Sequence, residues 1–486
     1  MVFSSAIFLF LFLPLVLFGH WIAGRRFRNF VLLIASLIFY AWGEGVYIVV
    51  MLASIMMNYL FGLVLDSRWA SESQLDGPSQ RHKWLLAGMV VLNLLPLFYF
   101  KYIVFFLANV NLLLPVEMQV TIPTEVRLPI GISFFTFQAM SYVVDVYRKV
   151  SHAQRSFLGL GVYISLFPQL IAGPIVRYKD VSEQIKERVQ TMSLFVSGVE
   201  RFIFGLGKKV LIANQLGFMA DKIFGFPDSE LGFMTAWLGI ICYALQIYFD
   251  FSGYSDMAIG LGRMLGFRFL ENFNFPYIAT SIRGFWQRWH ISLSGWFRDY
   301  VYIPLGGNRH GHWRTARNLL IVFLVCGLWH GASWNFIIWG LLHGLFLVLE
   351  RGNWGVLLER LPSVLKHMYV LFVVITAWVF FRAETLDDSL HYLSIMYSIP
   401  ESWSLHATIG IRLDLQFMTA LIAGFILATP AYKFLCKQYE IQCASKHASI
   451  ANIGQIGKLV LLLTIFSLAI MDIAIGSYNP FIYFRF

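Results

Sequence analysis

The sequence predicts an all-α integral membrane protein that crosses the bilayer many times. Of its 486 residues, 58% are hydrophobic and 13% are charged, and the mean hydropathy is +0.66. Soluble domains contain about 25% charged residues, so this composition excludes an ordinary globular protein. Apolar runs recur from one end of the chain to the other. We therefore expect one membrane domain spanning residues 1–486.

The first apolar run, residues 1–24, resembles a signal peptide at first sight. It lacks a basic n-region and a clear small-residue cleavage site, so we interpret it as a retained first span. Arg25, Arg26 and Arg28 follow it directly. Positive residues favour the cytoplasmic side, which predicts a periplasmic N-terminus.

Eleven further apolar segments follow along the chain. A helix of roughly 20 apolar residues crosses a bilayer, so these segments and the N-terminal run predict about 10–12 transmembrane helices. The segments are 29–42, 46–65, 84–107, 128–147, 157–176, 193–219, 231–250, 317–349, 366–381, 415–435 and 457–476.

Segment 157–176 differs from the others because basic residues flank it on both sides. Pro168, Gly173 and Pro174 also interrupt any helix there. Irregular backbone at membrane depth is tolerated only where protein buries it or where it lines a cavity. We therefore predict a broken or re-entrant element.

Residues 246–316 contain few clean spans and are rich in aromatic side chains. Between 281 and 317 there are six arginines, no lysine and a single acid, Asp299. This composition is typical of short amphipathic helices at the membrane interface. We expect spanning helices to surround a central funnel or tunnel, with this block as its polar floor.

The net charge of +10 does not indicate a nucleic-acid partner in so apolar a chain. Basic loops on the cytoplasmic face, next to membrane lipids, explain it better. The four cysteines have neither metal-ligand nor redox spacing, and no metal site is expected.

His330 is the leading candidate for catalysis. It lies in residues 321–350, which carry no formal charge before Glu350. An ionisable group at membrane depth costs about 3 kcal/mol or more, so it needs a cavity, partners or neutrality. Imidazole is easily kept neutral and moves protons near neutral pH. A histidine that merely bonds a neighbouring helix is the alternative.

The surroundings of His330 favour a polar site. Gly327 and Gly331 have the small-residue spacing that permits close helix approach. Trp329, Ser333 and Asn335 add polar groups to the apolar run.

His343 has a similar local frame, yet it lies about 140° around and about 20 Å along an ideal helix from His330. The two cannot share one site unless the helix breaks, so we expect His343 to be structural.

His290 lies in an aromatic stretch with Ser292 and Ser294 nearby. An anchoring histidine in an interfacial aromatic belt is as plausible as a functional one. Asp299 is expected to hold Arg298 rather than to act in catalysis. The short loop 305–309 offers backbone N–H groups to a phosphate.

Asp250, Ser255 and Asp256 have two interpretations of equal weight. They line a cation path or ligate a cation, or they are buried carboxylates with internal partners. His310 and His312 resemble a solvated basic loop.

Several ordered blocks resemble the membrane-bound O-acyltransferase family, particularly the bacterial branch that acetylates secreted polysaccharide. The blocks are LPIGISF (128–134), FPQLIAGP (167–174), YFDFSGYSDMAIG (248–260), FWQRWHISLS (285–294), RDYVYIPLGGNR (298–309) and GLWHGA (327–332). They keep the family's order over nearly the whole chain, with a signature core of about 128–350.

The resemblance implies a helical funnel and two signature histidines, which fall on His290 and His330. It implies an acetyl group taken from a cytoplasmic thioester, with acetyl-CoA as the expected donor, and no tightly bound cofactor. A periplasmic partner of the SGNH type then completes transfer to a polymer such as alginate or cellulose. The residues expected to bind the donor or substrate are Asn308, Arg298, Arg309, Asp299, Trp329, Ser333 and Asn335.

Other function classes remain open on the sequence. A related transferase would move D-alanine or a lipid acyl group. A transporter or channel would use the intramembrane His, Asp and Arg groups as an ion path, although no inverted repeat is visible. A third possibility is a scaffold that anchors periplasmic enzymes.

Overall fold

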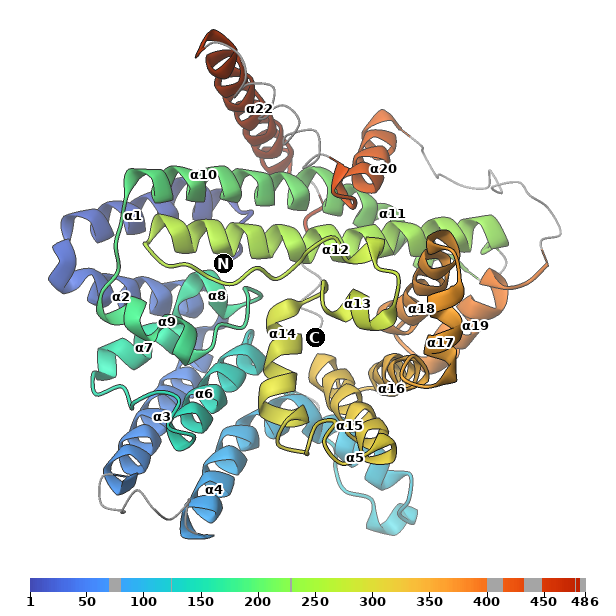
Figure 1. Ribbon diagram of the computed structural model, residues 1–486, viewed down its shortest axis with the longest axis horizontal. Coiled ribbons are helices and arrows are strands. Elements are labelled where there is room, and N and C mark those ends of the chain that lie inside the picture. Colours follow the sequence, from blue (N-terminus) through green and yellow to red (C-terminus); the bar gives the residue numbers. More distant parts are fainter. Residues whose placement is uncertain are drawn as a thin grey trace. The chain divides into compact units, whose positions relative to one another are not determined.

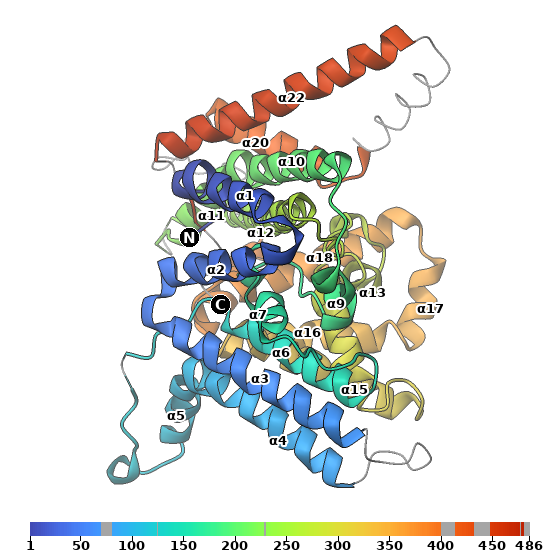
Figure 2. The ribbon, with the colours of Figure 1, turned by 90° about the vertical axis from the view of Figure 1, so that its left-hand side faces the viewer.

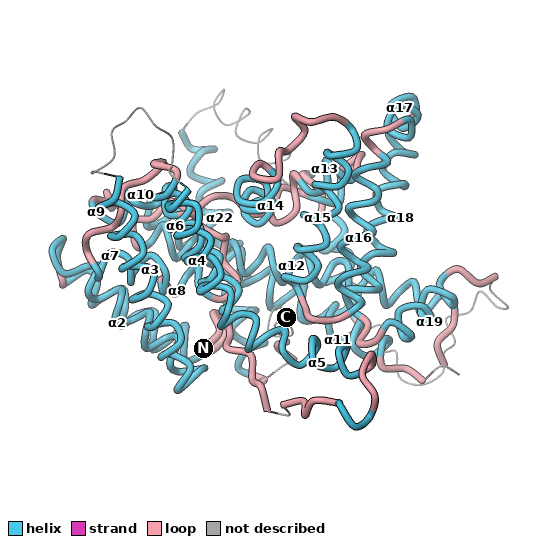
Figure 3. The backbone as a smooth tube through the Cα atoms, turned by 90° about the horizontal axis from the view of Figure 1, so that it is seen from below, coloured by secondary structure: helices cyan, strands magenta, loops and turns pink. Residues whose placement is uncertain are grey.

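Every regular element in the described part of the chain is a helix, as Figure 3 shows by colour. The computed structural model describes residues 1–69, 80–123, 125–227, 230–399, 414–431, 448–476 and 478–480. The predicted all-α class is therefore confirmed. Backbone contacts divide the chain into two compact units, Met1–Val199 with Ala258–Leu270 and Glu200–Met257 with Glu271–Phe486.

The first unit contains nine helices of its own, several of which are seen in Figure 2. They are α1 (Leu13–Ile22), α2 (Gly24–Glu44), α3 (Ile48–Trp69), α4 (Gln80–Leu97), α5 (Ile103–Asn111), α6 (Ile132–Tyr147), α7 (Phe157–Ser165), α8 (Phe167–Leu170) and α9 (Tyr178–Lys186). α6 is its core, because nearly all of its residues are buried and it packs against α3, α4, α7 and α9.

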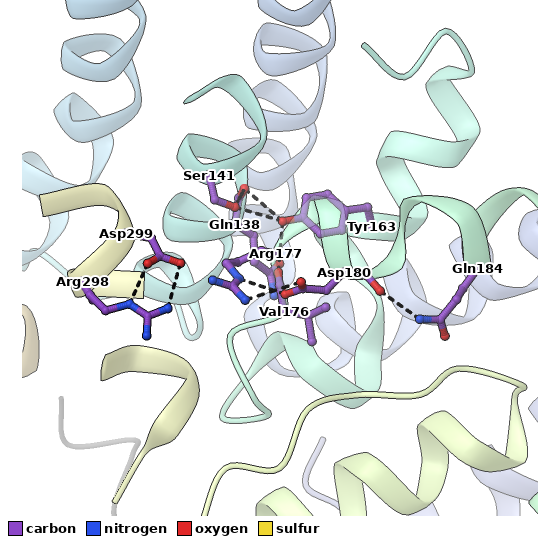
Figure 4. Close-up of polar contacts among 9 residues, drawn as sticks. All are labelled: Gln138, Ser141, Tyr163, Val176, Arg177, Asp180, Gln184, Arg298 and Asp299. Atoms are coloured by element: carbon purple, nitrogen blue, oxygen red, sulfur yellow. Dashed lines mark hydrogen bonds and ion pairs between the residues drawn. The ribbon is translucent and has the colours of Figure 1, made fainter. Parts of the chain in front are cut away.

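The predicted break in segment 157–176 is confirmed. α7 ends at Ser165, α8 lasts only four residues, and irregular backbone leads to α9. The Tyr163 hydroxyl holds this segment to α6, since it lies 3.2 Å from the Gln138 backbone oxygen and 3.1 Å from that of Val176 (Figure 4). The segment is almost wholly buried, as irregular backbone in a membrane protein requires.

The second unit holds the other helices. In the described residues they include the second half of α10 (Met192–Gly207), the π-helical turn η5 (Lys208–Ala213), α11 (Asn214–Phe224), most of α12 (Phe233–Met264), α13 (Ile282–Trp286), α14 (Ile291–Phe297), the π-helical turn η7 (Arg298–Tyr302), α15 (His312–His330), α16 (Trp334–Leu349), α17 (Asn353–Arg360), α18 (Ser363–Arg382), α19 (Leu386–Met396), α20 (Leu415–Leu427) and α22 (Ala448–Ala474).

The expectation that residues 246–316 contain few clean spans is wrong for residues 246–264. α12 continues to Met264, so the YFDFSGYSDMAIG motif lies on one long helix (Figure 1). Its two acids, Asp250 and Asp256, are paired with Lys209 and Lys208. This pairing permits a buried helix at a position where the charges alone predicted the end of a span. The short helices expected between 281 and 317 are present as α13, α14 and η7.

Segment 317–349 is a helical hairpin and not one continuous helix, which corrects the sequence interpretation. α15 ends at His330, Gly331 is extended, and α16 begins at Trp334. The two helices pack along each other (Figures 1 and 3). A Cβ on Gly327 would lie 2.2 Å from the Phe336 carbonyl oxygen, so the predicted close approach at this glycine is confirmed.

Five helical stretches in the described residues are long and apolar enough to cross a membrane: Gly24–Asp66, Gln80–Asn111, Phe233–Met264, Ser363–Arg382 and Gly454–Ala474. Shorter apolar helices occupy Phe8–Ile22, Trp334–Leu349 and Leu415–Leu427. Apolar side chains such as Phe18, Leu60 and Leu95 are exposed on these helices, as lipid contact requires. Cys436, Cys443 and most of the polar loop 66–83 lie outside the described residues.

Gly327→Leu is expected to destabilise the protein by about 1–3 kcal/mol or more, because the added side chain forces α15 and α16 apart. The measurement is the midpoint of thermal unfolding in detergent. Gly88→Ala is the matched control, since nothing lies within 4 Å of a Cβ at that position in α4. Unfolding of Gly327→Leu at the wild-type temperature would contradict the close packing.

Candidate functional site

His290 occupies a tight turn between α13 and α14. Its φ of 44° places it in the left-handed region, which non-glycine residues adopt only when their surroundings compel it. The backbone N–H of Ile291 donates to the Asn272 carbonyl oxygen at 3.0 Å and thereby holds the turn. The imidazole is fully buried and lies edge-on to Phe251, with ring centroids 4.6 Å apart.

The Asn272 side chain determines which nitrogen of His290 carries the proton. The backbone N–H of Ser292 donates to Asn272 Oδ1 at 3.2 Å, and a backbone amide can only donate, so the acceptor is the amide oxygen. The same oxygen lies 3.1 Å from His290 Nδ1, which must therefore bear hydrogen. Nε2 then keeps the lone pair, and this buried nitrogen has no hydrogen-bond partner among the described residues.

Burial lowers the pKa of His290 from 6.5 to about 3. The ring is therefore neutral at physiological pH, with Nε2 as a hydrogen-bond acceptor. A histidine that is buried neutral must take up a proton as the chain unfolds in acid. It thus contributes stability that is complete above about pH 6.5 and is lost as the pH falls toward 3.

The Asn272 side chain is anchored to α12 in turn. Its Nδ2 donates to the Ser255 hydroxyl at 3.1 Å. The neighbouring Glu271 binds Arg201 on α10, and Arg201 also donates to Asp256 at 2.7 Å. The segment that orients His290 is therefore fixed to α10 and α12 by one hydrogen bond and one ionic bridge.

The two acidic side chains on α12 are paired with basic residues. Lys208 binds Asp256 at 2.6 Å, and Lys209 binds Asp250 at 2.8 Å with both side chains only 3% exposed. Buried charges persist only when paired, since removing one partner costs about 3–5 kcal/mol. Of the two sequence interpretations of Asp250 and Asp256, the contacts favour carboxylates with internal partners.

His330 terminates α15 and is 3% exposed. Its ring lies 5.0 Å from the centroids of Trp339 on α16 and Phe381 on α18. The ring therefore lies in a buried aromatic environment formed by three helices.

Trp329 brings the two candidate histidines into one cluster. Its ring centroid lies 4.9 Å from that of His330 and 6.2 Å from that of His290. The cluster therefore unites residues 40 positions apart in a buried aromatic environment.

His343 joins the edge of this cluster because the helix breaks after His330. Trp339 lies 5.0 Å from both His330 and His343. Trp286 Nε1 donates to His343 Nδ1 at 3.3 Å, and the histidine is fully buried among aromatic rings. These packing contacts agree with the expected structural role.

Asn335 fixes the turn that follows His330. Its Nδ2 donates to the backbone oxygens of Ala383 and Thr385, at 2.9 and 3.0 Å, and so ties the start of α16 to the end of α18. Ser333 is the residue that precedes α16, but its hydroxyl makes no capping hydrogen bond. The contacts of Asn335 are those of a residue that positions the hairpin.

Four of the residues expected to bind the donor are more exposed than the histidines, namely Arg298, Asp299, Asn308 and Arg309. Arg298 binds Asp299 at 2.8 Å, as Figure 4 shows, and Asn308 and Arg309 are exposed on the following loop. Asn318 holds this loop through the carbonyl oxygens of Leu305 and Gly307, at 3.1 and 2.9 Å. The arrangement suits contact with a soluble, charged ligand.

Sequence reasoning missed Asn272, Glu271, Arg201, Lys208 and Lys209. The three basic residues lie in or beside a predicted apolar span, as do Asp250 and Asp256. Opposite charges in two apolar segments were a usable signal for ion pairs. Asn272 gave no such signal, because its role depends on a turn 18 residues later.

Several known proteins are similar to this chain over most of its length. The profile of the membrane-bound O-acyltransferase family (MBOAT) matches residues 38–382. The chain is 41% identical to the probable alginate O-acetylase AlgI of Pseudomonas putida over all of both chains. It is 33% identical to the peptidoglycan O-acetyltransferase of Helicobacter pylori, over 100% of this chain and 98% of that one. It is 28% identical to the teichoic acid D-alanyltransferase of Bacillus subtilis, over 75% and 91% of the two chains.

Asn272→Asp is expected to raise the pKa of His290 from its value of about 3, because a carboxylate stabilises the imidazolium where the neutral amide does not. NMR titration of the ¹⁵N-labelled histidine measures this shift. Asn274→Asp is the control, since Asn274 is exposed two residues away. An unchanged titration of His290 in Asn272→Asp would refute the assigned contact.

Proposed function

The chain belongs to the membrane-bound O-acyltransferase family and is a multi-pass membrane O-acyltransferase, and on that premise we propose that His290 and His330 form its acyl-transfer centre. The observation that carries this proposal is the contact of both imidazoles with Trp329. Acyl transfer from a thioester requires removal of a proton from an attacking hydroxyl, and histidine suits this step near neutral pH.

The two histidines differ in ways that suit different roles. His330 ends a helix, where the dipole stabilises the imidazolium that forms when it takes the hydroxyl proton. His290 is neutral with Nε2 as acceptor, so it accepts a hydrogen bond from a second hydroxyl of the substrate and orients it, while the proton of the attacking hydroxyl goes to His330. In the alternative mechanism, His330 is a nucleophile that carries the acyl group. That mechanism requires the same two histidines.

The donor that fits best is acetyl-CoA in the cytoplasm. Coenzyme A carries phosphate groups, and arginine binds phosphate through its planar fork. Arg298 and Arg309 are exposed on neighbouring segments, with Asn308 between them in sequence and Asp299 orienting Arg298. We assign these residues to the charged part of the donor and the buried histidines to its thioester.

The acceptor that fits best is a polysaccharide outside the cytoplasmic membrane. The relatives are named for alginate, peptidoglycan and teichoic acid, which are all polymers of the cell envelope. The acetyl group must then cross the inner membrane, and a periplasmic partner of the SGNH type completes the transfer. A periplasmic N-terminus, with Arg25, Arg26 and Arg28 in the cytoplasm, belongs to the same proposal.

D-alanyl transfer is the second candidate, favoured by the 28% identity to a D-alanyltransferase over 75% of the chain. The 41% identity to an alginate O-acetylase over the whole chain favours acetyl transfer. A transporter function has less support, because Asp250 and Asp256 are paired with basic residues.

His330→Ala is expected to lower acetyl transfer from radiolabelled acetyl-CoA by about 10²-fold or more, because it removes the base. His290→Gln is expected to reduce the rate less, since the glutamine amide still offers a hydrogen-bond acceptor. The assay measures turnover of the radiolabelled thioester by the purified protein in detergent, a step that does not require the periplasmic partner.

His310→Ala serves as the control, because His310 is an exposed histidine of the basic loop. Turnover by His330→Ala equal to that of His310→Ala would disprove the catalytic assignment. Acetyl transfer that is absent from the wild type while D-alanyl transfer is present would favour the second candidate.

A further inference from the structure

Arg188 in the first unit is held by neutral groups only. Its Nε donates to the Leu265 carbonyl oxygen at 3.1 Å, and its Nη1 donates to Asn29 Oδ1 at 2.7 Å. Its Nη2 lies 3.3 Å from His20 Nε2. The guanidinium carbon also lies over the ring of Phe267, 4.6 Å from its centroid. Its position is thus fixed by four contacts, none of which neutralises its charge.

Arg28 supplies a second positive charge close enough to act on both Arg188 and His20. It precedes Asn29 on α2, and its Nε is buried without a hydrogen-bond partner among the described residues. Burial and, to a smaller extent, the charge of Arg28 lower the pKa of Arg188 to about 10. The two guanidinium groups therefore repel each other in a partly desolvated position.

No carboxylate in the described residues forms a salt bridge with either arginine. The acids of α9 are engaged elsewhere, Asp180 with Arg177 at 2.9 Å and Glu183 with Lys186 at 3.2 Å. The first turn of α2 contains no acid either. Two like charges that are partly buried and unpaired are unfavourable unless an anion binds between them.

The backbone is shaped for this arrangement. Gly266 has a φ of 87°, and a Cβ there would lie 3.3 Å from Arg188 Cδ and 2.8 Å from Gln190 Cγ. Asn29 Nδ2 also donates to the Ile185 carbonyl oxygen at 2.8 Å, which joins α2 to the end of α9. Contacts within the protein therefore hold the Arg188 side chain in place without a ligand.

We propose that Arg28 and Arg188 form a binding site for a phosphate group, with His20 holding Arg188 in place. A guanidinium fork matches two phosphate oxygens, and two such groups supply the charge that a phosphate requires. The phosphate belongs either to an anionic lipid headgroup or to a soluble phosphate ester. This site goes beyond the acyl-transfer function, since no part of it depends on His290 or His330.

The test uses the purified full chain in a neutral detergent and measures the unfolding temperature as each probe is titrated. One probe is phosphatidylglycerol in mixed micelles, compared with zwitterionic phosphatidylcholine. The other is pyrophosphate, compared with sodium chloride of equal ionic strength. We expect at least one phosphate probe to stabilise the wild type above its control.

Arg28→Gln is expected to weaken the apparent affinity about tenfold, the effect of losing one charge-assisted hydrogen bond. Its fold is expected to be retained, because no hydrogen bond from Arg28 to another described side chain holds the structure. Arg26→Gln is the matched control, an exposed arginine on the same helical turn. Arg188→Lys keeps the charge and removes the fork, so its affinity is expected to fall as well.

A response to phosphatidylglycerol alone identifies a lipid site, and a response to pyrophosphate identifies a site for soluble phosphate. The proposal is overturned if neither probe stabilises the wild type, or if Arg28→Gln binds as tightly as Arg26→Gln. Neither result bears on acetyl transfer by His330, so the two proposals fail independently.

Discussion

The carboxamide of Asn272 joins α12 to the turn that carries His290, and the geometry of the site depends on this contact. Its oxygen accepts hydrogen bonds from His290 Nδ1 and from the Ser292 backbone and hydroxyl, while its nitrogen donates to Ser255. A buried donor left without its partner costs about 1–3 kcal/mol. The contact therefore stabilises a left-handed turn and selects the tautomer that leaves Nε2 as an acceptor.

Asn272 is positioned in turn by charges that an apolar protein must keep paired. Arg201 links Glu271 to Asp256, and Lys208 binds the same aspartate. In a medium of low polarity, hydrogen bonds and ion pairs are stronger, and unpaired groups are more costly. These ion pairs link the segment that carries Asn272 to α10 and α12, so the packing of the two helices determines where the site lies. Aromatic rings surround the site and bury His290.

The sequence was most informative where composition and strong helix breakers decide structure. Membrane character, the break at Pro168 and the close packing at Gly327 were predictable from residue types alone. The break after His330 was not predictable, because the run from 321 to 349 contains neither a formal charge nor a proline. The hairpin depends on Asn335 reaching the end of α18. The helical state of the YFDFSGYSDMAIG motif was missed for a similar reason, since its acids need Arg201, Lys208 and Lys209 to be tolerated.

The site itself was predictable in part. His290 and His330 were identifiable as polar groups in unusual surroundings, yet their proximity rests on Trp329, which no spacing rule connects to His290. The role of Asn272 was not predictable, because it lies in an irregular stretch where no helical or strand periodicity marks its position. Its hydrogen bonds join residues that only the folded chain brings together.

A double-mutant cycle on kcat/KM for acetyl transfer tests most directly whether the two histidines form one centre. The cycle compares His290→Ala, His330→Ala and the double variant with the wild type. Residues that act as a unit give strongly non-additive effects. The contacts through Trp329 predict that the double variant loses little more activity than the worse single variant. Losses that multiply would contradict a shared centre and would show that the histidines act independently.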